Sequence, residues 1–292
     1  MRKPNFFIVG APRCATTTVY TYLKQHPDIF LSLLKEPLFF GSDLTPHPLA
    51  ISDEAAYLRL FAGAGESRVI GEGSVFYWMS KRAAGEIHAW SPEARILIML
   101  RDPLEMMQSL HALFLRTGNE ELEDFARALE AEAARAQGQR LPARVYFPEG
   151  LQYRALARFS EAVERFLRVF GEQRVHVLLF EELMSDPTRA MRGLLDFLGV
   201  DPDVPLEFEP VRAAQRIRPL VLRQMRAASP EVLEKLERKT AKHLHHGPRG
   251  APLPLELEAR LREELRPDGE RLEALLGRPL SAWYRPPGGV ST

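Results

Sequence analysis

The sequence predicts an α/β protein in which a central, mainly parallel sheet is flanked by helices in three layers. Short, predominantly apolar runs alternate with amphipathic segments, as is typical of a parallel sheet whose strands are buried on both faces. The clearest runs are residues 6–9, 94–100 and 175–180. With 292 residues, 45% of them hydrophobic, the chain is long enough for one large α/β domain. We therefore expect a single domain over residues 1–292.

The first apolar run leads into a candidate phosphate-binding loop. Gly10-Ala11-Pro12 follows the run, and three threonines then open a segment with helical spacing, which predicts strand, tight loop and helix. Unpaired N–H groups in the first turn of a helix, together with the helix dipole, attract anions. This P-loop-like pattern nearly matches GxxxxGK[ST], but Ala15 and Thr16 replace the second Gly and the Lys, and the cation is Arg13. The alternative is an ordinary threonine-rich turn.

A charged pair next to an apolar anchor follows the first helix. His26-Pro27 ends that helix, and Lys35-Glu36 stands directly before Pro37-Leu38-Phe39-Phe40. The two aromatic side chains must be buried, so we expect the neighbouring Glu36 carboxylate to be held in a fixed position. Alternatively, Lys35 and Glu36 are solvated loop charges.

The next unit contains a helix over residues 54–61 and a strand over residues 68–71. Residues 71–77 follow the strand, and open parallel sheets bind their ligands at the carboxyl ends of strands. Ser74 and Tyr77 are therefore candidate substrate contacts. A buried aromatic corner explains these residues equally well.

A second candidate phosphate contact follows the third unit. Residues 83–90 predict a helix, residues 94–100 a central strand, and Arg101-Asp102-Pro103 opens a helix that carries Ser109. An Arg at the end of a strand and a hydroxyl two turns into the next helix can meet on one phosphate, with bidentate guanidinium contacts. The alternative is a surface ion pair of Arg101 with Asp102 or Glu105.

The rest of the chain is predicted to be helical apart from one strand. Amphipathic spacing predicts helices over residues 119–140, 153–170, 188–198, 255–265 and 268–276, and an apolar run predicts a strand over residues 175–180. The triplet His243, His245 and His246 has no carboxylate or Cys at a useful spacing, so we expect no metal.

Composition limits the partners and the compartment. Lys and Arg together number 39, and so do Asp and Glu, so the formal net charge is zero. The overall charge of the protein therefore does not attract nucleic acid or an anionic membrane. The single cysteine, Cys14, excludes an internal disulfide framework and fits a reducing compartment. No apolar run approaches the roughly 20 residues that span a bilayer, and the strand near Phe6 leaves no room for a signal peptide. We expect a cytoplasmic protein without a membrane span that binds no nucleic acid; its oligomeric state is open.

Three motifs resemble the sulfotransferases that use 3′-phosphoadenosine 5′-phosphosulfate (PAPS). The loop from Gly10 to Thr18 is similar to the family's 5′-phosphosulfate loop, with Arg13 and Ala15 where Lys and Gly are usual. The segment from Arg101 to Ser109 matches RDPxxRxxSxY, except that Met106 and His111 replace its second Arg and its Tyr. Lys35 to Phe40 matches the KEPxFF element of the heparan-sulfate-type branch.

This resemblance implies sulfuryl transfer from PAPS to a hydroxyl or amine of a carbohydrate, lipid or small molecule. Glu36 takes the position of the family's catalytic base, Arg13 would stabilise the leaving phosphate, and His111 is the reserve base. Substrate contacts would come from Lys35, Ser74 and Tyr77. The implied donor-binding residues are Arg13, Cys14, Ala15, Thr16, Thr17, Thr18, Arg101, Ser109, Arg216 and Arg218, without a metal.

Two alternatives belong to other classes. A P-loop kinase-like phosphotransferase shares the first loop, but it would need the missing Lys and an apolar strand that ends in a magnesium-binding Asp. A catalytically inactive relative that retained the nucleotide pocket is suggested by Arg13 and Ala15, because Arg is bulkier than Lys and Ala adopts a positive φ less readily than Gly.

Overall fold

The computed structural model describes residues 2–208 and 253–284. The chain divides into two compact units, the first formed by Met1–Leu100 and Leu167–His246 and the second by Arg101–Phe166 and Gly247–Thr292. Each unit is described by itself, and the single domain over residues 1–292 stays a prediction. Arg216 and Arg218, two of the expected donor-binding residues, lie outside the described residues.

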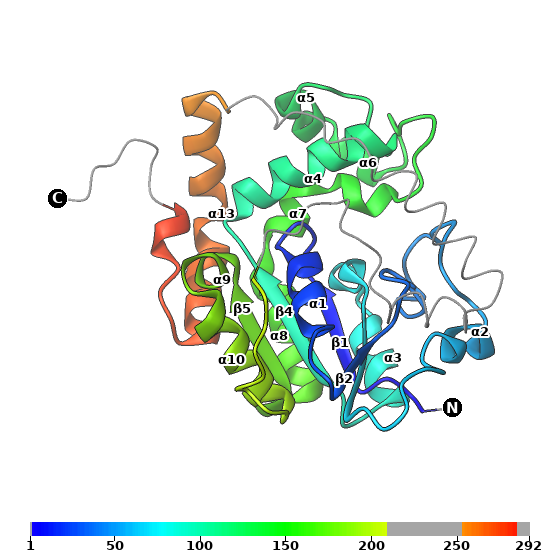
Figure 1. Cartoon of the computed structure of the whole chain (residues 1–292). Coiled ribbons are helices and arrows are strands. Elements are labelled where there is room, and N and C mark those ends of the chain that lie inside the picture. The colour runs from blue at the N-terminus through cyan, green and yellow to red at the C-terminus, as the bar shows by residue number, and fades with distance from the viewer. Residues whose placement is uncertain (1, 209–252, 285–292) are drawn as a thin grey trace. The chain divides into compact units, whose positions relative to one another are not determined.

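The first unit is built on a five-stranded sheet with the strand order β2-β3-β1-β4-β5 (Figure 1). All four strand pairings of this sheet are parallel. The strands are β1 (Phe6–Gly10), β2 (Ile29–Leu31), β3 (Val69–Gly73), β4 (Arg95–Leu100) and β5 (Val175–Leu179). The structure thus confirms the predicted α/β class with a parallel sheet flanked by helices.

The core of this unit lies along the central strands. Every residue of β1 and β3 is buried, as expected for strands covered on both faces. In the register of this pair, Phe6 lies opposite Gly71. A Cβ at Gly71 would come within 2.7 Å of the Phe6 side chain, so glycine is required for the strands to approach this closely.

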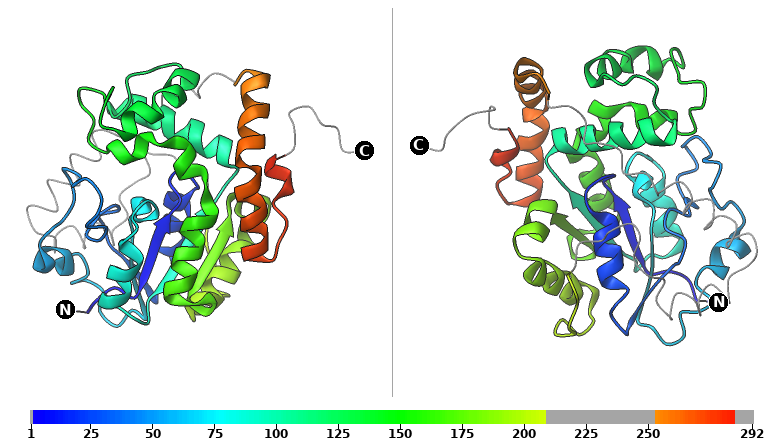
Figure 2. Two further views of the ribbon diagram at one scale, coloured as in Figure 1. Left: turned by 180° about the vertical axis from the view of Figure 1, so that it is seen from behind. Right: turned by 45° about the horizontal axis from the view of Figure 1, so that its top comes forward.

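Helices cover both faces of the sheet. Figures 1 and 2 show α1 (Thr16–Leu23) on one face and α3 (Ala83–Trp90) on the opposite face. This placement follows from right-handed crossovers that leave β1 and β3 in opposite directions along the sheet. The other helical elements of this unit are α2 (Glu54–Arg59), η1 (Val75–Trp78), η3 (Glu172–Arg174), α9 (Phe180–Ser185) and α10 (Pro187–Leu198).

The second unit is helical in its described part. Its elements are α4 (Pro103–Thr117), α5 (Phe125–Glu130), α6 (Glu132–Ala136), η2 (Pro148–Leu151), α7 (Tyr153–Ala157), α13 (Leu255–Leu276) and η4 (Ser281–Tyr284). Helix α8 (Phe159–Phe170) crosses the boundary between the two units.

The structure corrects three helix predictions. Residues 153–170 form two helices with a break at Arg158, whose φ and ψ (−82° and 89°) are not helical. Residues 255–276 form one helix through Pro267 instead of two. The buried side chains of Leu261, Leu265 and Leu272 hold its apolar face in place, which outweighs the single backbone hydrogen bond that a proline removes.

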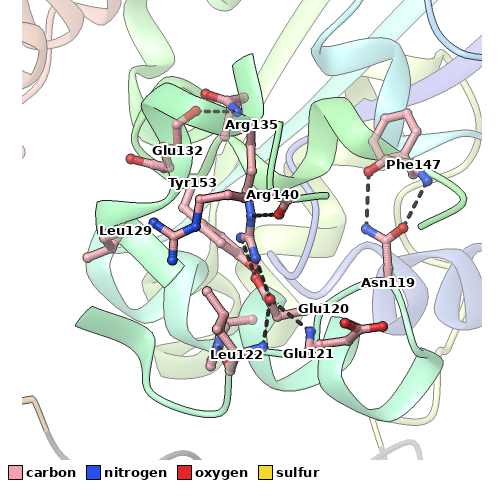
Figure 3. Close-up of polar contacts among 12 residues, drawn as sticks. Asn119, Glu120, Glu121, Leu122, Leu129, Glu132, Arg135, Arg140, Phe147 and Tyr153 are labelled. Atoms are coloured by element: carbon pink, nitrogen blue, oxygen red, sulfur yellow. Dashed lines mark hydrogen bonds and ion pairs between the residues drawn. The ribbon is translucent and has the colours of Figure 1, made fainter. Parts of the chain in front are cut away.

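The helix predicted over residues 119–140 is also wrong at its start, because side chains bind the backbone there (Figure 3). The amide oxygen of Asn119 accepts hydrogen bonds from the N–H groups of Tyr146 and Phe147 at 2.9 and 2.8 Å. Glu120 accepts from its neighbours Glu121 and Leu122, both at 2.8 Å. Side-chain bonds of this kind compete with helix formation.

The Glu120 carboxylate also anchors the core of this unit. It accepts two hydrogen bonds from the Arg135 guanidinium, at 2.6 and 2.7 Å, and one from the Tyr153 hydroxyl at 3.0 Å. Burial disfavours the charged carboxyl, but the Arg135 guanidinium and the N–H groups of Leu122 and Glu121 hold the pKa of Glu120 below its usual value. The ion pair of Glu120 and Arg135 therefore has the hydrogen-bond partners that its burial requires.

Candidate active site

The predicted phosphate-binding loop leaves the sheet where β1 ends. The Ala11 N–H donates to the Met99 carbonyl of β4 at 2.7 Å, so the loop starts at the carboxyl ends of two adjacent strands. The connection after β1 leads toward β2 and the connection after β4 leads toward β5, in opposite directions along the sheet. Open α/β sheets bind their ligands at such a switch point.

The loop is closed by residues in a left-handed conformation. Ala15, which precedes α1, has φ 61° and ψ 18°, and Arg13 has φ 65°. The Ala15 carbonyl accepts from the N–H groups of Thr18 and Val19 at 2.9 and 3.2 Å. Alanine is thus found where the resemblance implies glycine, and it adopts the conformation that glycine favours, at a cost of roughly 1–2 kcal/mol.

The side chains of the loop differ in exposure. Arg13 and Thr17 are exposed, whereas Cys14 and Thr16 are buried. The Cys14 thiol lies 3.4 Å from the Pro12 carbonyl, to which it donates. The loop therefore offers solvent one guanidinium and one hydroxyl, and the N–H groups of Thr16 and Thr17 belong to the first helical turn, which has no intrahelical acceptors.

Glu36 is fixed against the residues that follow β3. Its N–H donates to the Gly73 carbonyl at 2.8 Å, and its Oε2 accepts from the Val75 N–H at 2.8 Å. Its Oε1 accepts from Lys35 Nζ at 2.6 Å, and both side chains keep about a fifth of their surface exposed. The carboxylate is therefore held in position and still reachable from solvent, as expected of a positioned Glu36.

Ser74 and Tyr77 face the protein interior. Both are fully buried. The Ser74 hydroxyl accepts from the Leu38 N–H at 3.1 Å, and the Tyr77 hydroxyl accepts from the Phe39 and Phe40 N–H groups at 3.0 and 3.3 Å. Their role as substrate contacts stays a prediction, and these bonds match the alternative of a buried aromatic corner.

Glu72, which sequence reasoning did not select, joins these hydroxyls. Its carboxylate accepts from Ser74 at 2.8 Å, from Tyr77 at 2.7 Å and from Tyr57 at 3.4 Å. The side chain has no exposed surface, and this burial raises the pKa of Glu72 to about 7. An acidic residue inside a run of buried strand residues was the available signal, because a buried carboxyl needs hydrogen-bond partners.

The second phosphate motif lies at the start of the second unit. The Asp102 carboxylate caps α4 by accepting from the N–H groups of Leu104 and Glu105 at 2.9 and 3.1 Å. The guanidinium of Arg101 pairs with Glu105, with Nε 2.8 Å from Oε2. Ser109 is half-buried on the same helix. Arg101 thus forms one of the surface pairs considered from sequence, and its contact with phosphate stays a prediction.

His111 is packed among aromatic side chains. Its ring contacts Phe125 and Tyr153, with centroids 5.1 and 5.8 Å away. Nε2 lies 2.8 Å from the Leu122 carbonyl, which requires a proton on that nitrogen. Burial lowers the pKa of His111, so the neutral ring is favoured. These contacts suit a structural histidine, and the role of reserve base stays a prediction.

In the described parts of the chain, no helix is long and apolar enough to cross a bilayer. Residues 2–208 and 253–284 also contain no group of three or more His, Cys, Asp or Glu side chains arranged to hold a metal ion.

Comparisons with known proteins agree on one family. The model of the sulfotransferase family matches residues 54–204. Human carbohydrate sulfotransferase 15 is 28% identical over 251 residues, which cover 68% of this chain and 44% of that protein. Human heparan sulfate glucosamine 3-O-sulfotransferase 6 is 24% identical, over 68% of this chain and 53% of that protein. The chain thus spans about half the length of these curated relatives.

A solved structure extends the likeness over nearly the whole chain. The sulfotransferase from Alicyclobacillus acidocaldarius is 33% identical, has a TM-score of 0.74, and covers 98% of this chain and 100% of its own. The sulfotransferase domain of the curacin biosynthetic pathway, at 16% identity and a TM-score of 0.52, shares the fold. Family model and structural neighbour together show that this chain belongs to the sulfotransferase family.

Proposed function

We propose that this sulfotransferase transfers the sulfuryl group of PAPS to a hydroxyl or amine of a carbohydrate. The observation that carries the proposal is the loop between β1 and α1, which places Arg13 and the first turn of α1 at the switch point of the sheet. N–H groups and a guanidinium suit a phosphosulfate anion. A Lys for the β- and γ-phosphates of a nucleoside triphosphate is missing, which argues against the kinase-like alternative.

The donor supplies an activated sulfur, and the protein supplies charge and orientation. When the acceptor oxygen bonds to that sulfur, the bond between sulfur and the bridging oxygen breaks, and its electron pair stays on the 5′-phosphate. Arg13 and the donors of Thr16 and Thr17 stabilise this charge. Transfer of this kind depends mainly on positioning and electrostatics, so the reaction needs no metal in this proposal.

Glu36 receives the acceptor proton. Its carboxylate is fixed by Lys35 and by the Val75 N–H while part of its surface stays exposed. Glu36 precedes Pro37 at the carboxyl end of β3, and β3 pairs with β1. Base and phosphate loop therefore belong to the same edge of one sheet, which is the arrangement that general base catalysis on a bound acceptor requires.

In this proposal the remaining donor contacts come from the segment that resembles the family's 3′-phosphate motif. Arg101 and Ser109 bind the 3′-phosphate, as the family resemblance implies, with Arg216 and Arg218 as further contacts. Lys35, whose side chain is partly exposed, is the proposed acceptor contact. Ser74 and Tyr77, the other two acceptor contacts predicted from sequence, are fully buried.

The names of the relatives favour carbohydrate over the lipid and small-molecule acceptors that the sequence leaves open. The test is an acceptor screen with ³⁵S-labelled PAPS on desulfated heparan sulfate, a glycolipid and a phenol. We expect labelled product from the polysaccharide, and none from an Arg13→Ala variant. Labelled lipid or phenol alone would contradict the carbohydrate acceptor.

A binding measurement separates the alternatives. We expect adenosine 3′,5′-bisphosphate to raise the melting temperature well above the effect of ATP with magnesium. Equal shifts would favour the kinase-like protein. A shift specific to the bisphosphate, without any sulfated product, would indicate the inactive relative.

A further inference from the structure

The proposed base Glu36 belongs to a segment, residues 35–40, in which three backbone N–H groups are bound through one buried carboxylate. Glu72 accepts from the Ser74 and Tyr77 hydroxyls at 2.8 and 2.7 Å. These two hydroxyls in turn accept the N–H groups of Leu38, Phe39 and Phe40. Three backbone donors of the segment thus reach a single carboxylate through two hydroxyl relays.

The segment needs such support because its backbone is strained. Glu36 and Leu38, on either side of Pro37, have φ values of 62° and 52°, in the left-handed region that L-residues rarely adopt. Residues in this region persist only where the surroundings hold them. Two further hydrogen bonds join the segment to the carboxyl end of β3. The Glu36 N–H donates to the Gly73 carbonyl, and the Val75 N–H donates to the Glu36 carboxylate.

We propose that Glu72 is a positioning residue for catalysis: through Ser74 and Tyr77 it holds residues 36–40 in the conformation that presents the Glu36 carboxylate to the acceptor. The inference rests on the proposed role of Glu36 as the base. It gives Ser74 and Tyr77 a role different from substrate contact.

The relay requires Glu72 as the ionised carboxylate, because a protonated carboxyl carries a donor of its own. Burial raises the pKa of Glu72 to about 7, so the measurements below are made at about pH 8.5, where the carboxylate prevails. A hydroxyl has one hydrogen, and Ser74 and Tyr77 must each direct it toward Glu72 so that their lone pairs face the backbone N–H groups. An amide in place of the carboxylate offers one oxygen and one NH₂ group. The hydroxyl next to this NH₂ group would have to accept a hydrogen bond from the NH₂ group. The hydrogen of that hydroxyl would then point toward a backbone N–H group, and two donors would face each other. One relay therefore fails in Glu72→Gln although the side-chain volume is unchanged.

The matched control is Glu86 in α3, which accepts backbone N–H groups of the adjacent segment directly and also accepts from the Ser42 hydroxyl. Its carboxylate accepts from the Gly41 N–H at 2.7 Å and from the Ser42 N–H at 3.3 Å. Glu86→Gln therefore makes the same chemical change next to the segment and leaves residues 36–40 untouched.

The first measurement is amide hydrogen exchange of the full chain, which requires no acceptor. In Glu72→Gln we expect exchange at Leu38, Phe39 and Phe40 to become about 10-fold faster, while β1 and β4 keep their protection. In Glu86→Gln we expect the change at Gly41 and Ser42 only. Unchanged exchange at residues 38–40 in Glu72→Gln would overturn the proposal.

The second measurement is turnover of PAPS with desulfated heparan sulfate. We expect Glu72→Gln to lower kcat about 10- to 100-fold, because a small displacement of a catalytic group has effects of this size, with the acceptor KM and the affinity for adenosine 3′,5′-bisphosphate within about twofold of wild type. Tyr77→Phe removes a single relay and should show the same pattern in kcat. A higher acceptor KM at unchanged kcat in Tyr77→Phe would instead make Tyr77 a substrate contact and overturn the proposal.

Failure of the base role is distinguishable from failure of the relay. If Glu36→Gln retains full turnover, Glu36 is not the base, whatever the exchange data show for Glu72. If Glu36→Gln is inactive while Glu72→Gln has wild-type kcat, the base role stands and the positioning role of Glu72 is wrong.

Discussion

The guanidinium of Arg262, in α13, lies 3.0 Å from the carboxylate of Asp102, although 160 residues separate the two in sequence. The other carboxylate oxygen of Asp102 caps α4 through Leu104 and Glu105. Asp102 therefore ties the start of α4, directly after Arg101, to the C-terminal helix of the same unit. The middle residue of the Arg101-Asp102-Pro103 motif thus has a structural role that the sequence pattern does not reveal.

The first prediction concerns the contribution of this contact to stability. Both side chains are mostly buried, at 14% and 13% exposure. Arg262→Met removes the charge-assisted contact with Asp102 together with the pair of Arg262 and Glu258, and it should lower the free energy of unfolding by about 1–3 kcal/mol. Urea denaturation measures the loss. Arg266→Met is the control, since its pair with Glu263 is exposed and worth at most about 1 kcal/mol. Equal losses in the two variants would contradict a specific role of Arg262.

The second prediction concerns the proposed 3′-phosphate contact. Arg101→Ala removes a charge-assisted contact worth roughly 1.5–3 kcal/mol, whereas Ser109→Ala removes a neutral hydroxyl bond worth about 0.5–1.5 kcal/mol. Calorimetric titration with adenosine 3′,5′-bisphosphate should therefore show the larger loss for Arg101. Comparable losses would mean that Arg101 serves only in its ion pair.

The ion pair of Arg101 and Glu105 allows a test in which the affinity for the bisphosphate should rise instead of fall. Glu105, in the first turn of α4, accepts from Arg101, which precedes this helix, so a phosphate has to compete with it. Glu105→Gln weakens the competitor and should raise the affinity for the bisphosphate roughly two- to fivefold. Glu105→Gln combined with Arg101→Ala should give no such gain.

The third prediction separates the two candidate bases. Glu36→Gln retains the shape of the side chain but cannot accept a proton, so turnover should fall roughly 10²- to 10⁴-fold with nearly unchanged bisphosphate affinity. His111→Gln should retain turnover within a few-fold, because the ring is packed against Phe125 and Tyr153 and donates to a carbonyl. An inactive His111→Gln beside an active Glu36→Gln would transfer the proton-accepting role to His111.

Sequence reasoning located the elements that depend on local pattern. Strands β1, β4 and β5 consist mainly of apolar residues, and the loop after β1 is marked by Gly10 and by the threonines of α1. Periodicity failed where side chains bind the backbone, as at Asn119 and Glu120, and where packing carries a helix through Pro267. These features depend on partners distant in sequence.

The same limit applies to the candidate site. The position of Glu36 next to an apolar anchor was predictable, because the two phenylalanines after it had to be buried. The hydroxyl relays were not, because nothing local shows that Ser74 and Tyr77 face Glu72 and the N–H groups of residues 38–40. A buried acidic residue in a strand is visible in sequence, but its partners are known only from the structure.

The fourth prediction follows from the buried carboxyl of Glu72. Burial raises its pKa to about 7 in the folded protein, above roughly 4.3 in the unfolded chain, so folding favours the protonated form. The stability from this group is fully present below about pH 4.3 and is lost as the pH rises through about 7. Urea unfolding of wild type and Glu72→Gln across this range should show wild type losing stability relative to the variant, with a constant difference above about pH 8. A difference independent of pH would contradict the raised pKa.

The last prediction concerns Ala15, which takes the position where the family usually has glycine. Its φ of 61° lies in the left-handed region, where an L-residue is disfavoured by roughly 1–2 kcal/mol. Glycine avoids this cost, but it also makes the unfolded chain more flexible, which offsets part of the stabilisation. Ala15→Gly should therefore raise the free energy of unfolding by about 0.5–1 kcal/mol. Ala190→Gly, the same change inside α10, should lower it by about 1 kcal/mol. Changes of opposite sign in the free energy of unfolding, measured by urea denaturation, would confirm that the backbone conformation of the loop decides the effect and not the loss of a methyl group. A destabilised Ala15→Gly variant would show instead that the Ala15 side chain is needed at this position.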